Sequence, residues 1–392
     1  MRRVRLLPFE YATRNLGRSP SRTALMASAC ALVALLVIAS LSFLRGVERS
    51  LELSGSPDNV ILLGAGSEES VERSQVPLAA ASAASTAIRG IRRRLDQAYV
   101  SPELHMALEV ARDAASPSRT AIVRGVTPAA FLVHPQVRIV EGRFPEKGRS
   151  EVLVGRMAAE KADLDPQDLA LGGSLWFDGR PWTVCGRFEA PRTVMDAEIW
   201  ATLEELQIVG QRQDVSCIVL TLDPAAGGDF ADVDVFTARR LDLELAALRE
   251  TEYYSRLAEF LAPIRWLVAI TAALCAFGGV FGGLNALYAA FAARQRENGT
   301  LQVLGFSRLA IAVSLLVESL LIAAVGAIVA VACGRLFLDG LAVRFSMGAF
   351  ALIVDGGVAA ASTVAALALG AAAALISQLR VQLLTIPETL RS

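Results

Sequence analysis

The residues best suited to a binding function lie in a short polar segment, 293–309, which separates two long apolar runs. Arg294, Arg296, Glu297 and Arg308 supply its charge. Apolar residues interrupt the polar ones at Leu301, Val303, Leu304 and Phe306. This mixture predicts a short helix with one apolar face, and short loops rich in arginine face the cytoplasm. Such a helix either docks a soluble partner or lies in the lipid headgroup layer, and spacing alone leaves both interpretations open.

Bond-making chemistry is not predicted for this chain. The phosphate-binding pattern G-x-x-x-x-G-K-[ST] does not occur, and the only lysines, Lys147 and Lys161, lie in unsuitable contexts. The patterns G-x-S-x-G and H-E-x-x-H and paired-cysteine metal spacings are missing as well. The two histidines, His105 and His134, are isolated in the sequence, so a histidine-based metal site is not expected. We therefore expect no enzyme activity and no cofactor in this chain.

The five cysteines divide into two groups. Three of them fall in apolar runs and are expected to pack as small hydrophobic residues: Cys30, Cys275 and Cys333. Cys185 and Cys217 fall in strand-like runs of the soluble part. They could form a disulfide if that part lies outside the cytoplasm, but sequence cannot place their Cβ atoms.

The composition indicates membrane helices combined with a soluble domain. The chain has 392 residues, of which 54% are hydrophobic, and its mean hydropathy is +0.46. These values are too high for an ordinary soluble domain and too low for a protein made only of membrane helices. The net charge of −1 and the lack of a long basic tract argue against a nucleic-acid partner.

Four stretches are long and apolar enough to cross a bilayer: 23–44, 264–291, 310–337 and 349–377. Residues 1–22 are rich in arginine and predict a cytoplasmic, interfacial helix before the first span. The first stretch exceeds the apolar region of a signal peptide, so we favour an uncleaved helix over a cleaved leader. The resulting topology has four transmembrane helices, both termini in the cytoplasm, and the intervening domain outside it.

Residues 45–261 are predicted to form a large mixed α/β extracytoplasmic domain with two lobes, which makes the chain an α+β membrane protein. Asp178-Gly179 predicts a hairpin turn, and Gly142 and Gly155 are expected at turns that need positive φ. A helix is expected from Val76 to Leu95. A second, amphipathic helix is expected over 239–260, either as a stalk that leads to the second span or as an ordinary last helix of the domain.

Several segments resemble FtsX/MacB-type permeases, the membrane subunits of type VII ABC transporters. The polar segment has the form R-x-R-E-x-G-x-L-x-x-L-G-x-S-R, in Arg294, Arg296, Glu297, Gly299, Leu301, Leu304, Gly305, Ser307 and Arg308. Asn298 departs mildly from the apolar residue usual there. Glu141, Gly142, Arg143 and Phe144 resemble the E-G-R-x-F turn of the family's outer domain, and the terminal residues 386–391, IPETLR, resemble its P-x-E-A-L-R ending. We assign Glu141 and Arg143 no chemistry, because a charged pair in a turn is usually solvated or bridged.

The resemblance implies a domain 262–392 of FtsX type, in which the segment 293–309 is a coupling helix that sits in a cleft of a separate ATPase subunit. ATP and Mg²⁺ would then bind to that partner. The family assembles in pairs, which implies a homodimer or a pair with a related permease. It also implies an inner (plasma) membrane location, contact with membrane lipids, and in some systems a periplasmic adaptor.

The expected spans contain two notable kinds of residue, namely closely spaced glycines and a single carboxylate. Glycines four apart, Gly278 with Gly282 and Gly279 with Gly283, form a groove that allows close helix approach, within one subunit or between two. Glu318 is an intramembrane carboxylate, which by default suggests a proton or substrate path. It could also be protonated, pair with Asn285 or reach the cytoplasmic interface. Because family members often carry an acid there, we favour a structural or coupling role.

The resemblance implies that ATP-driven motion is transmitted to the outer domain, where it exports or extracts a lipid, lipoprotein, peptide or drug. One alternative is a machine of the same type that transports nothing and regulates a cell-wall hydrolase or a sensor kinase. Another is a stand-alone anchored structural protein, which would have no ATPase partner. The sequence does not identify the cargo.

Overall fold

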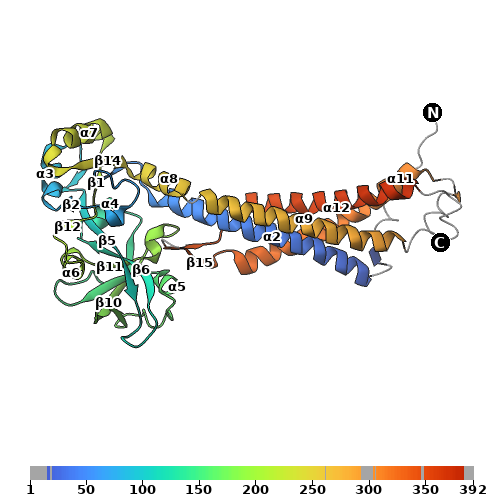
Figure 1. The fold of residues 1–392 in the computed structure, drawn as a ribbon, viewed down its shortest axis with the longest axis horizontal. Helices are drawn as coiled ribbons and strands as arrows, with labels where there is room; N and C mark the ends of the chain where they lie inside the picture. The colour runs from blue at the N-terminus through green and yellow to red at the C-terminus, as the bar shows by residue number, and fades with distance from the viewer. Residues whose placement is uncertain are drawn as a thin grey trace. The chain divides into compact units, whose positions relative to one another are not determined.

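The computed structural model describes residues 16–17, 20–260, 262–292, 303–304, 306–345 and 348–383. The chain divides into two compact units (Figure 1). One unit comprises 1–45, 263–341 and 352–392, and it is helical in its described part. The other comprises 46–262 and 342–351 and contains the large β-sheet.

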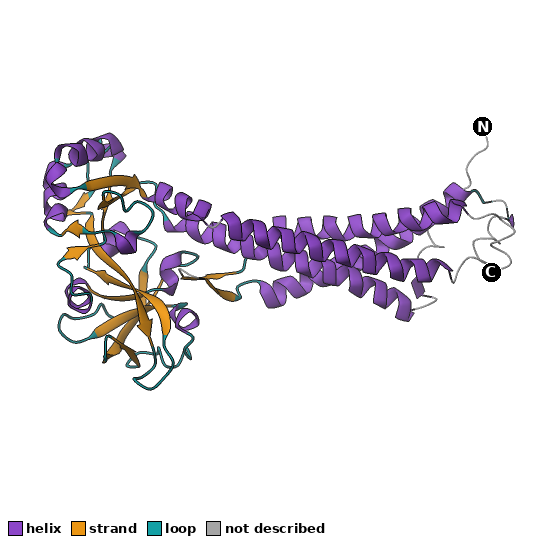
Figure 2. Cartoon of the chain, in the orientation of Figure 1, coloured by secondary structure: helices purple, strands orange, loops and turns teal. Residues whose placement is uncertain are grey.

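Within the described residues, four helices are long and apolar enough to cross a membrane. They are α2 (Pro20–Ser54), α9 (Ala262–Ala292), α11 (Arg308–Cys333) and α12 (Gly356–Leu383) (Figure 2). The first three overlap the stretches 23–44, 264–291 and 310–337, and their crossing of a membrane stays a prediction. Helix α2 runs ten residues further than expected and enters the second unit at Gly46. The predicted start of the fourth span at residue 349 is wrong, because 348–351 form a strand.

Small residues set the packing of these helices. A Cβ on Gly326 of α11 would lie 2.6 Å from the carbonyl oxygen of Ala27 in α2. A Cβ on Gly370 of α12 would lie 2.8 Å from the Cβ of Ala323 in α11. Only glycine permits helix backbones to approach so closely, and close approach is what stabilises helix pairs in lipid.

The second unit is built on a ten-stranded sheet in the order β14-β1-β13-β5-β6-β11-β8-β10-β7, with β9 paired to β10. The central strands are β13 (Cys217–Thr221), β5 (Val100–Val110), β6 (Arg119–Val126) and β11 (Ile199–Thr202). On one side of them lie β1 (Asn59–Gly64) and β14 (Leu245–Arg249). On the other lie β8 (Glu151–Gly155), β10 (Arg180–Glu189), β9 (Ser174–Phe177) and β7 (Arg138–Gly142).

Strand β5 joins the two halves of this sheet. Its first residues, from Val100 to Glu103, pair antiparallel with β13, and its later residues, from Leu104 to Val110, pair antiparallel with β6. The change of partner therefore falls between Glu103 and Leu104. The two predicted lobes are two halves of one sheet with a shared core, and β5 belongs to both.

The two faces of the sheet are covered by different elements. One face packs against α3 (Ala79–Ala87), α6 (Leu203–Val209) and α7 (Phe230–Arg239) in the main hydrophobic core. The other face meets α4 (Ala130–Val133), the helix α8 (Glu250–Phe260) and the 3₁₀ turn η2 (Val194–Ala197). Because alternate residues of a strand point to opposite faces, this second face receives Glu103, His105 and Arg124.

Two local predictions are confirmed and one is corrected. Asp178 (φ 53°) and Gly179 (φ 68°) form the two-residue turn between β9 and β10, with the double positive φ of a type I′ turn. Gly142 has φ +77°, as expected. Gly155 does not have positive φ. It is required for space, since a Cβ there would lie 2.4 Å from the carbonyl oxygen of Asp196.

Two helix predictions are too long. The expected helix Val76–Leu95 is reduced to α3, because Val76-Pro77 form a short strand, β2, that pairs with β12 (Asp214–Val215). The expected helix 239–260 is reduced to α8, and Leu245 to Arg249 form β14 against β1 instead. The leucines at 245 and 248 are buried by this pairing. Tertiary context therefore overrides local helix periodicity here.

The segment between α11 and α12 is not a plain loop. Its residues form a hairpin of β15 (Ala342–Phe345) and β16 (Gly348–Ala351), which belongs to the sheet-containing unit. Ala342 and Ala349 pack with Met157 and Ala197. Arg344 also bonds to Asp163, with Nη2 and Oδ1 2.6 Å apart. The hairpin is thus fixed to the rest of the sheet-containing unit by apolar and ionic contacts.

Candidate functional site

Most of the predicted coupling residues lie outside the described residues: Arg294, Arg296, Glu297, Gly299, Leu301 and Gly305. Of the remaining two, Leu304 is exposed. Ser307 is the N-cap of α11, and its hydroxyl accepts a hydrogen bond from the backbone N–H of Ala310 at 3.2 Å. This bond satisfies one of the free donors at the helix start. The ATPase-coupling role of the segment stays a prediction.

The other predicted residues lie in the helical unit. A Cβ on Gly279 would lie 2.1 Å from Val33 Cγ2 of α2, so this glycine serves packing within one chain. A Cβ on Gly278 would meet nothing within 4 Å. Gly282 and Gly283 lie in α9, and their surroundings fall outside the described residues. Glu318 is half-buried in α11.

A buried cluster of charged side chains lies on one face of the sheet. It was not predicted from the sequence. The register places His105 of β5 opposite Arg124 of β6, and Arg124 beside Trp200 of β11. It also places Glu103 of β5 opposite Cys217 of β13. Residues paired across neighbouring strands share a face. One row of side chains thus crosses four strands at the point where β5 changes partner.

Arg124 is the centre of the cluster. Its Nε and Nη2 atoms donate to the two carboxylate oxygens of Glu198 at 2.7 and 2.5 Å, and its Nη1 donates to Glu103 Oε2 at 2.8 Å. The Arg124 side chain is 3% exposed. Trp200 also donates from Nε1 to Glu198 Oε2 at 2.8 Å. The planar guanidinium therefore holds two carboxylates that would otherwise be buried and unpaired.

The second half of the cluster connects the sheet with α4 and α8. His134, which follows α4, lies with Nε2 3.0 Å from Glu103 Oε1. Its Nδ1 lies 3.8 Å from Glu250 Oε1 and has no hydrogen-bond partner. Glu250 begins α8 and accepts hydrogen bonds from Asn59 Nδ2 at 2.9 Å and from the backbone N–H of Ser56 at 2.8 Å. The start of α8 is thus linked to the segment that follows α2.

Burial and the neighbouring charges shift the pKa values in opposite directions. Burial alone would raise the pKa of Glu103, but the charges of His134 and Arg124 outweigh it and hold this pKa well below its usual range. Burial raises the pKa of Glu250. Burial also acts to lower the pKa of His134, yet Glu103 and Glu250 bring about a net increase. The pKa of the buried Cys217 thiol lies well above its usual value, mainly through desolvation. A protonated thiol is a poor nucleophile, so the cluster does not suit covalent catalysis.

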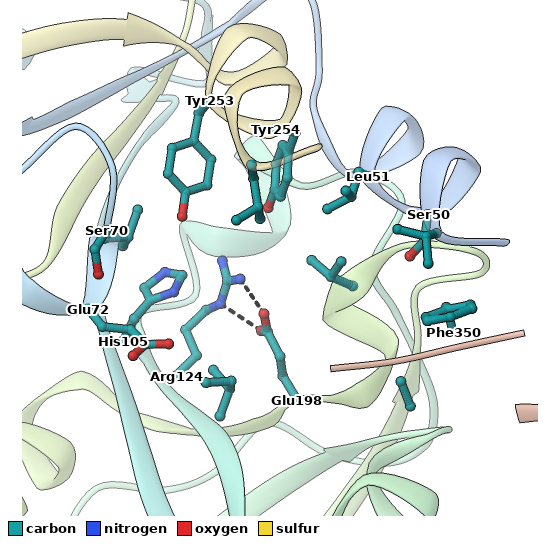
Figure 3. Close-up of a pocket in the computed structure, with 16 residues that line it drawn as sticks. Ser50, Leu51, Ser70, Glu72, His105, Arg124, Glu198, Tyr253, Tyr254 and Phe350 are labelled. Atoms are coloured by element: carbon teal, nitrogen blue, oxygen red, sulfur yellow. Dashed lines mark hydrogen bonds and ion pairs between the residues drawn. The ribbon is translucent and has the colours of Figure 1, made fainter. Parts of the chain in front are cut away.

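A pocket opens onto this cluster (Figure 3). In the figure Arg124 and Glu198 face each other and are joined by dashed lines, with the His105 ring on the other side of Arg124. Tyr253 and Tyr254 of α8 border it. The cavity volume is about 90 Å³, several times the roughly 10–15 Å³ that one water needs. Burial raises the pKa of Tyr253 to about 12, so its hydroxyl stays neutral.

Three segments that border the pocket are adjacent in sequence to candidate membrane helices. Val47, Ser50 and Leu51 belong to the last turns of α2, and Tyr253, Tyr254 and Leu257 belong to α8, which precedes α9. Ala349 and Phe350 belong to the hairpin that separates α11 from α12. All of them lie in the sheet-containing unit.

The disulfide that sequence left open is not formed. Cys185 lies on β10 and Cys217 on β13, and both are free. Four strands separate β10 from β13 in the sheet, so the two thiols cannot meet. The Glu141–Arg143 turn behaves as predicted, since Arg143 donates to both oxygens of Glu151 at 2.7 and 2.6 Å.

Two family models match the chain. The MacB-like periplasmic core domain matches residues 23–231, more than half of the chain, and the FtsX-like permease C-terminal domain matches residues 269–382. No curated protein matches. The helices long enough to cross a membrane agree with a membrane subunit.

Solved structures with similar folds include the periplasmic region of MacB from Actinobacillus actinomycetemcomitans. It is 12% identical with a TM-score of 0.39, and the match covers 54% of this chain and 97% of that one. The extracellular domain of the noncanonic ABC-type transporter YknZ from Gram-positive bacteria is 13% identical with a TM-score of 0.36, covering 48% and 99%. The family models, rather than these weak structural likenesses, carry the assignment. The chain belongs to the FtsX/MacB-type ABC permeases, membrane subunits whose ATPase is a separate protein.

Proposed function

We propose that this permease transmits ATP-driven motion from a cytoplasmic ATPase subunit to its sheet-containing domain, and thereby exports or extracts an amphiphilic cargo such as a lipid, lipoprotein, peptide or drug. In this proposal the sheet-containing domain lies outside the cytoplasm and both termini lie inside. The polar segment 293–309 is the ATPase contact, and two permease subunits act as a pair.

The convergence of three segments on one pocket carries the proposal. The end of α2, helix α8 and the β15–β16 hairpin each border the cavity above Arg124 and Glu198. Each segment is adjacent in sequence to at least one candidate membrane helix. A displacement of any of these helices therefore reaches the same place in the domain.

The buried charges make this place responsive to displacement. Glu250 at the start of α8 is bonded to Ser56 and Asn59, and it lies near His134, which contacts Glu103. Buried charges must stay paired, so a shift of α8 requires the partners to move with it or to exchange. Packed interiors of this kind change between discrete arrangements and do not deform continuously.

The coupling step is tested by bulky substitutions in the polar segment of the full-length chain. With the ATPase subunit that co-purifies, Glu297→Trp or Gly305→Trp should abolish permease-dependent stimulation of ATP hydrolysis. Membrane insertion should be unchanged, as measured by membrane fractionation. Leu95→Trp is a matched control, because Leu95 is 95% exposed in the sheet-containing unit and should tolerate the bulk. Unchanged stimulation in both segment variants would contradict the proposed contact.

The cargo step needs a separate measurement. The complex with its ATPase can be purified in mild detergent and its bound components identified by mass spectrometry, with and without ATP. A lipid, lipoprotein or small amphiphile that is lost on ATP hydrolysis supports export or extraction. A stoichiometric hydrolase or sensor kinase without such a ligand would instead show that the motion regulates a partner.

A further inference from the structure

We propose that Glu103, His105 and Cys217 form a binding site for one transition-metal ion of the zinc class, beneath the pocket of the sheet-containing unit. The proposal is independent of cargo and of ATPase coupling. It concerns three side chains that the paired strands bring together and that no sequence motif connects.

The strands hold the three donors on a rigid frame. Glu103 and His105 are two residues apart on β5 and so share one face, and Cys217 on β13 is directly opposite Glu103 in the register. Glu103 and Cys217 are buried and His105 is partly buried. Sites built on regular strands hold their geometry better than sites on loops.

The distances are close to those of a metal site. The three donor atoms all lie within 4.8 Å of one another. His105 Nε2 lies 3.6 Å from Glu103 Oε2 and 3.9 Å from Cys217 Sγ. Tetrahedral zinc with ordinary bond lengths places such atoms about 3.4–3.6 Å apart. Small side-chain rotations therefore bring all three into coordination. The mixture of imidazole nitrogen, thiolate sulfur and carboxylate oxygen favours zinc and its neighbours over Mg²⁺ or Ca²⁺.

The surrounding groups supply the outer contacts that a metal site needs. Arg124 Nη1 donates to Glu103 Oε2 at 2.8 Å, and His134 Nε2 contacts Oε1 at 3.0 Å, so both oxygens of the ligand carboxylate are held in place. A carboxylate oxygen has room for a metal and one hydrogen bond together. Such outer partners orient the ligands and strengthen binding.

The charges also balance. On binding, the thiol of Cys217 releases its proton to solvent and becomes a thiolate. The thiolate and the Glu103 carboxylate then neutralise a divalent ion. Arg124 keeps its two bonds to Glu198.

Of the three ligands, His105 borders the pocket, whose volume of about 90 Å³ holds several waters. A water molecule completes the tetrahedron. The ion joins β5 to β13 next to the point where β5 changes partner, and so stabilises the connection between the two halves of the sheet.

The test uses the full-length protein in detergent, purified through a tag without histidines and treated with a chelator. Titration with Co²⁺, which binds at zinc sites and is visible, should give tetrahedral absorption bands and a thiolate-to-cobalt charge-transfer band at about one ion per chain. Zn²⁺ should displace the cobalt and raise the unfolding temperature. Cys217→Ser should remove the charge-transfer band. It should also weaken cobalt binding by on the order of 100-fold or more, which exceeds the effect of losing a residue that only orients a ligand. The matched control is Cys185→Ser, because Cys185 is a half-buried cysteine on β10. This substitution should change neither the charge-transfer band nor the cobalt affinity.

Two results would overturn the proposal: a wild-type protein without the charge-transfer band, or a band that persists in Cys217→Ser. His105→Ala provides a second variant that leaves the thiol in place and should weaken binding to a similar degree. Should Cys217→Ser fail to fold, the wild-type charge-transfer band together with the weakened cobalt binding of His105→Ala decides the question.

Discussion

Removal of the Arg124 side chain should unfold the sheet-containing unit more readily than removal of any exposed arginine. Arg124→Met retains much of the apolar volume but leaves the carboxylates of Glu103 and Glu198 buried without their cation. Breaking a buried ion pair by deleting one partner costs about 3–5 kcal/mol. For a domain of this size, about 1 kcal/mol shifts Tm by roughly 2–4 °C, so a decrease of about 6–20 °C is expected.

Arg143→Met is the matched control. Arg143 also forms a two-bond pair with a carboxylate, that of Glu151, but its own side chain is 44% exposed. Glu151 keeps a backbone hydrogen bond from Glu146 when Arg143 is lost. Exposed pairs contribute about 0–1 kcal/mol, so Tm should fall by about 4 °C at most.

Tryptophan fluorescence during heating of the full-length protein measures both variants. Three of the four tryptophans report on the sheet-containing unit: Trp176, Trp182 and Trp200. A triple variant that combines Arg124→Met with Glu103→Gln and Glu198→Gln replaces both unpaired carboxylates with neutral amides. It should recover part of the decrease in Tm, because these two buried positions then carry no unpaired charge. An Arg124→Met variant no less stable than Arg143→Met would refute the conclusion that the cluster is buried and tightly paired.

Three further predictions concern other parts of the chain. Gly142→Ala should lower Tm by more than Gly148→Ala, since both have positive φ but only at Gly142 would a Cβ meet backbone, at 2.3 Å; thermal unfolding of both variants decides this. The Tm advantage of the wild type over Glu151→Gln should be full above the ordinary glutamate pKa of 4.5 and shrink as pH falls through the lowered pKa of Glu151, and a constant advantage would contradict the ion pair. Gly279→Leu should disturb the contact with α2 and reduce the yield of folded protein in detergent, while Gly278→Leu, where a Cβ meets nothing, should not, as measured by size-exclusion chromatography.

Local sequence was a good guide wherever one segment contains the whole signal. The apolar runs predict the long helices, because an uncharged stretch of this length has few other stable environments. Asp178-Gly179 predicts its hairpin, because this dipeptide suits two successive positive φ angles. The coupling motif and the E-G-R-x-F turn indicate the family, which two family models show.

Local sequence failed where a distant partner decides the structure. Residues 245–249 were predicted to be helical, but they pair antiparallel with β1 and form the edge strand β14. Residues 349–351 were predicted as the start of the fourth span, but they form a strand of the hairpin 342–351, which packs against Met157 and Ala197 in the sheet-containing unit. The need for Gly155 comes from Asp196, 41 residues away by the numbering.

Hydropathy and short motifs are local properties of the chain, so they were enough to identify a membrane permease with a large domain between its first two apolar runs. The position of the buried charged cluster depends instead on the tertiary structure. His105 and His134 read as isolated, and Cys217 read as a strand residue, yet the strand register brings His105 and Cys217 to Glu103, and the end of α4 brings His134 there. Charges so far apart along the chain become partners only when the sheet buries them together, because burial makes unpaired charge too costly and leaves pairing as the stable arrangement.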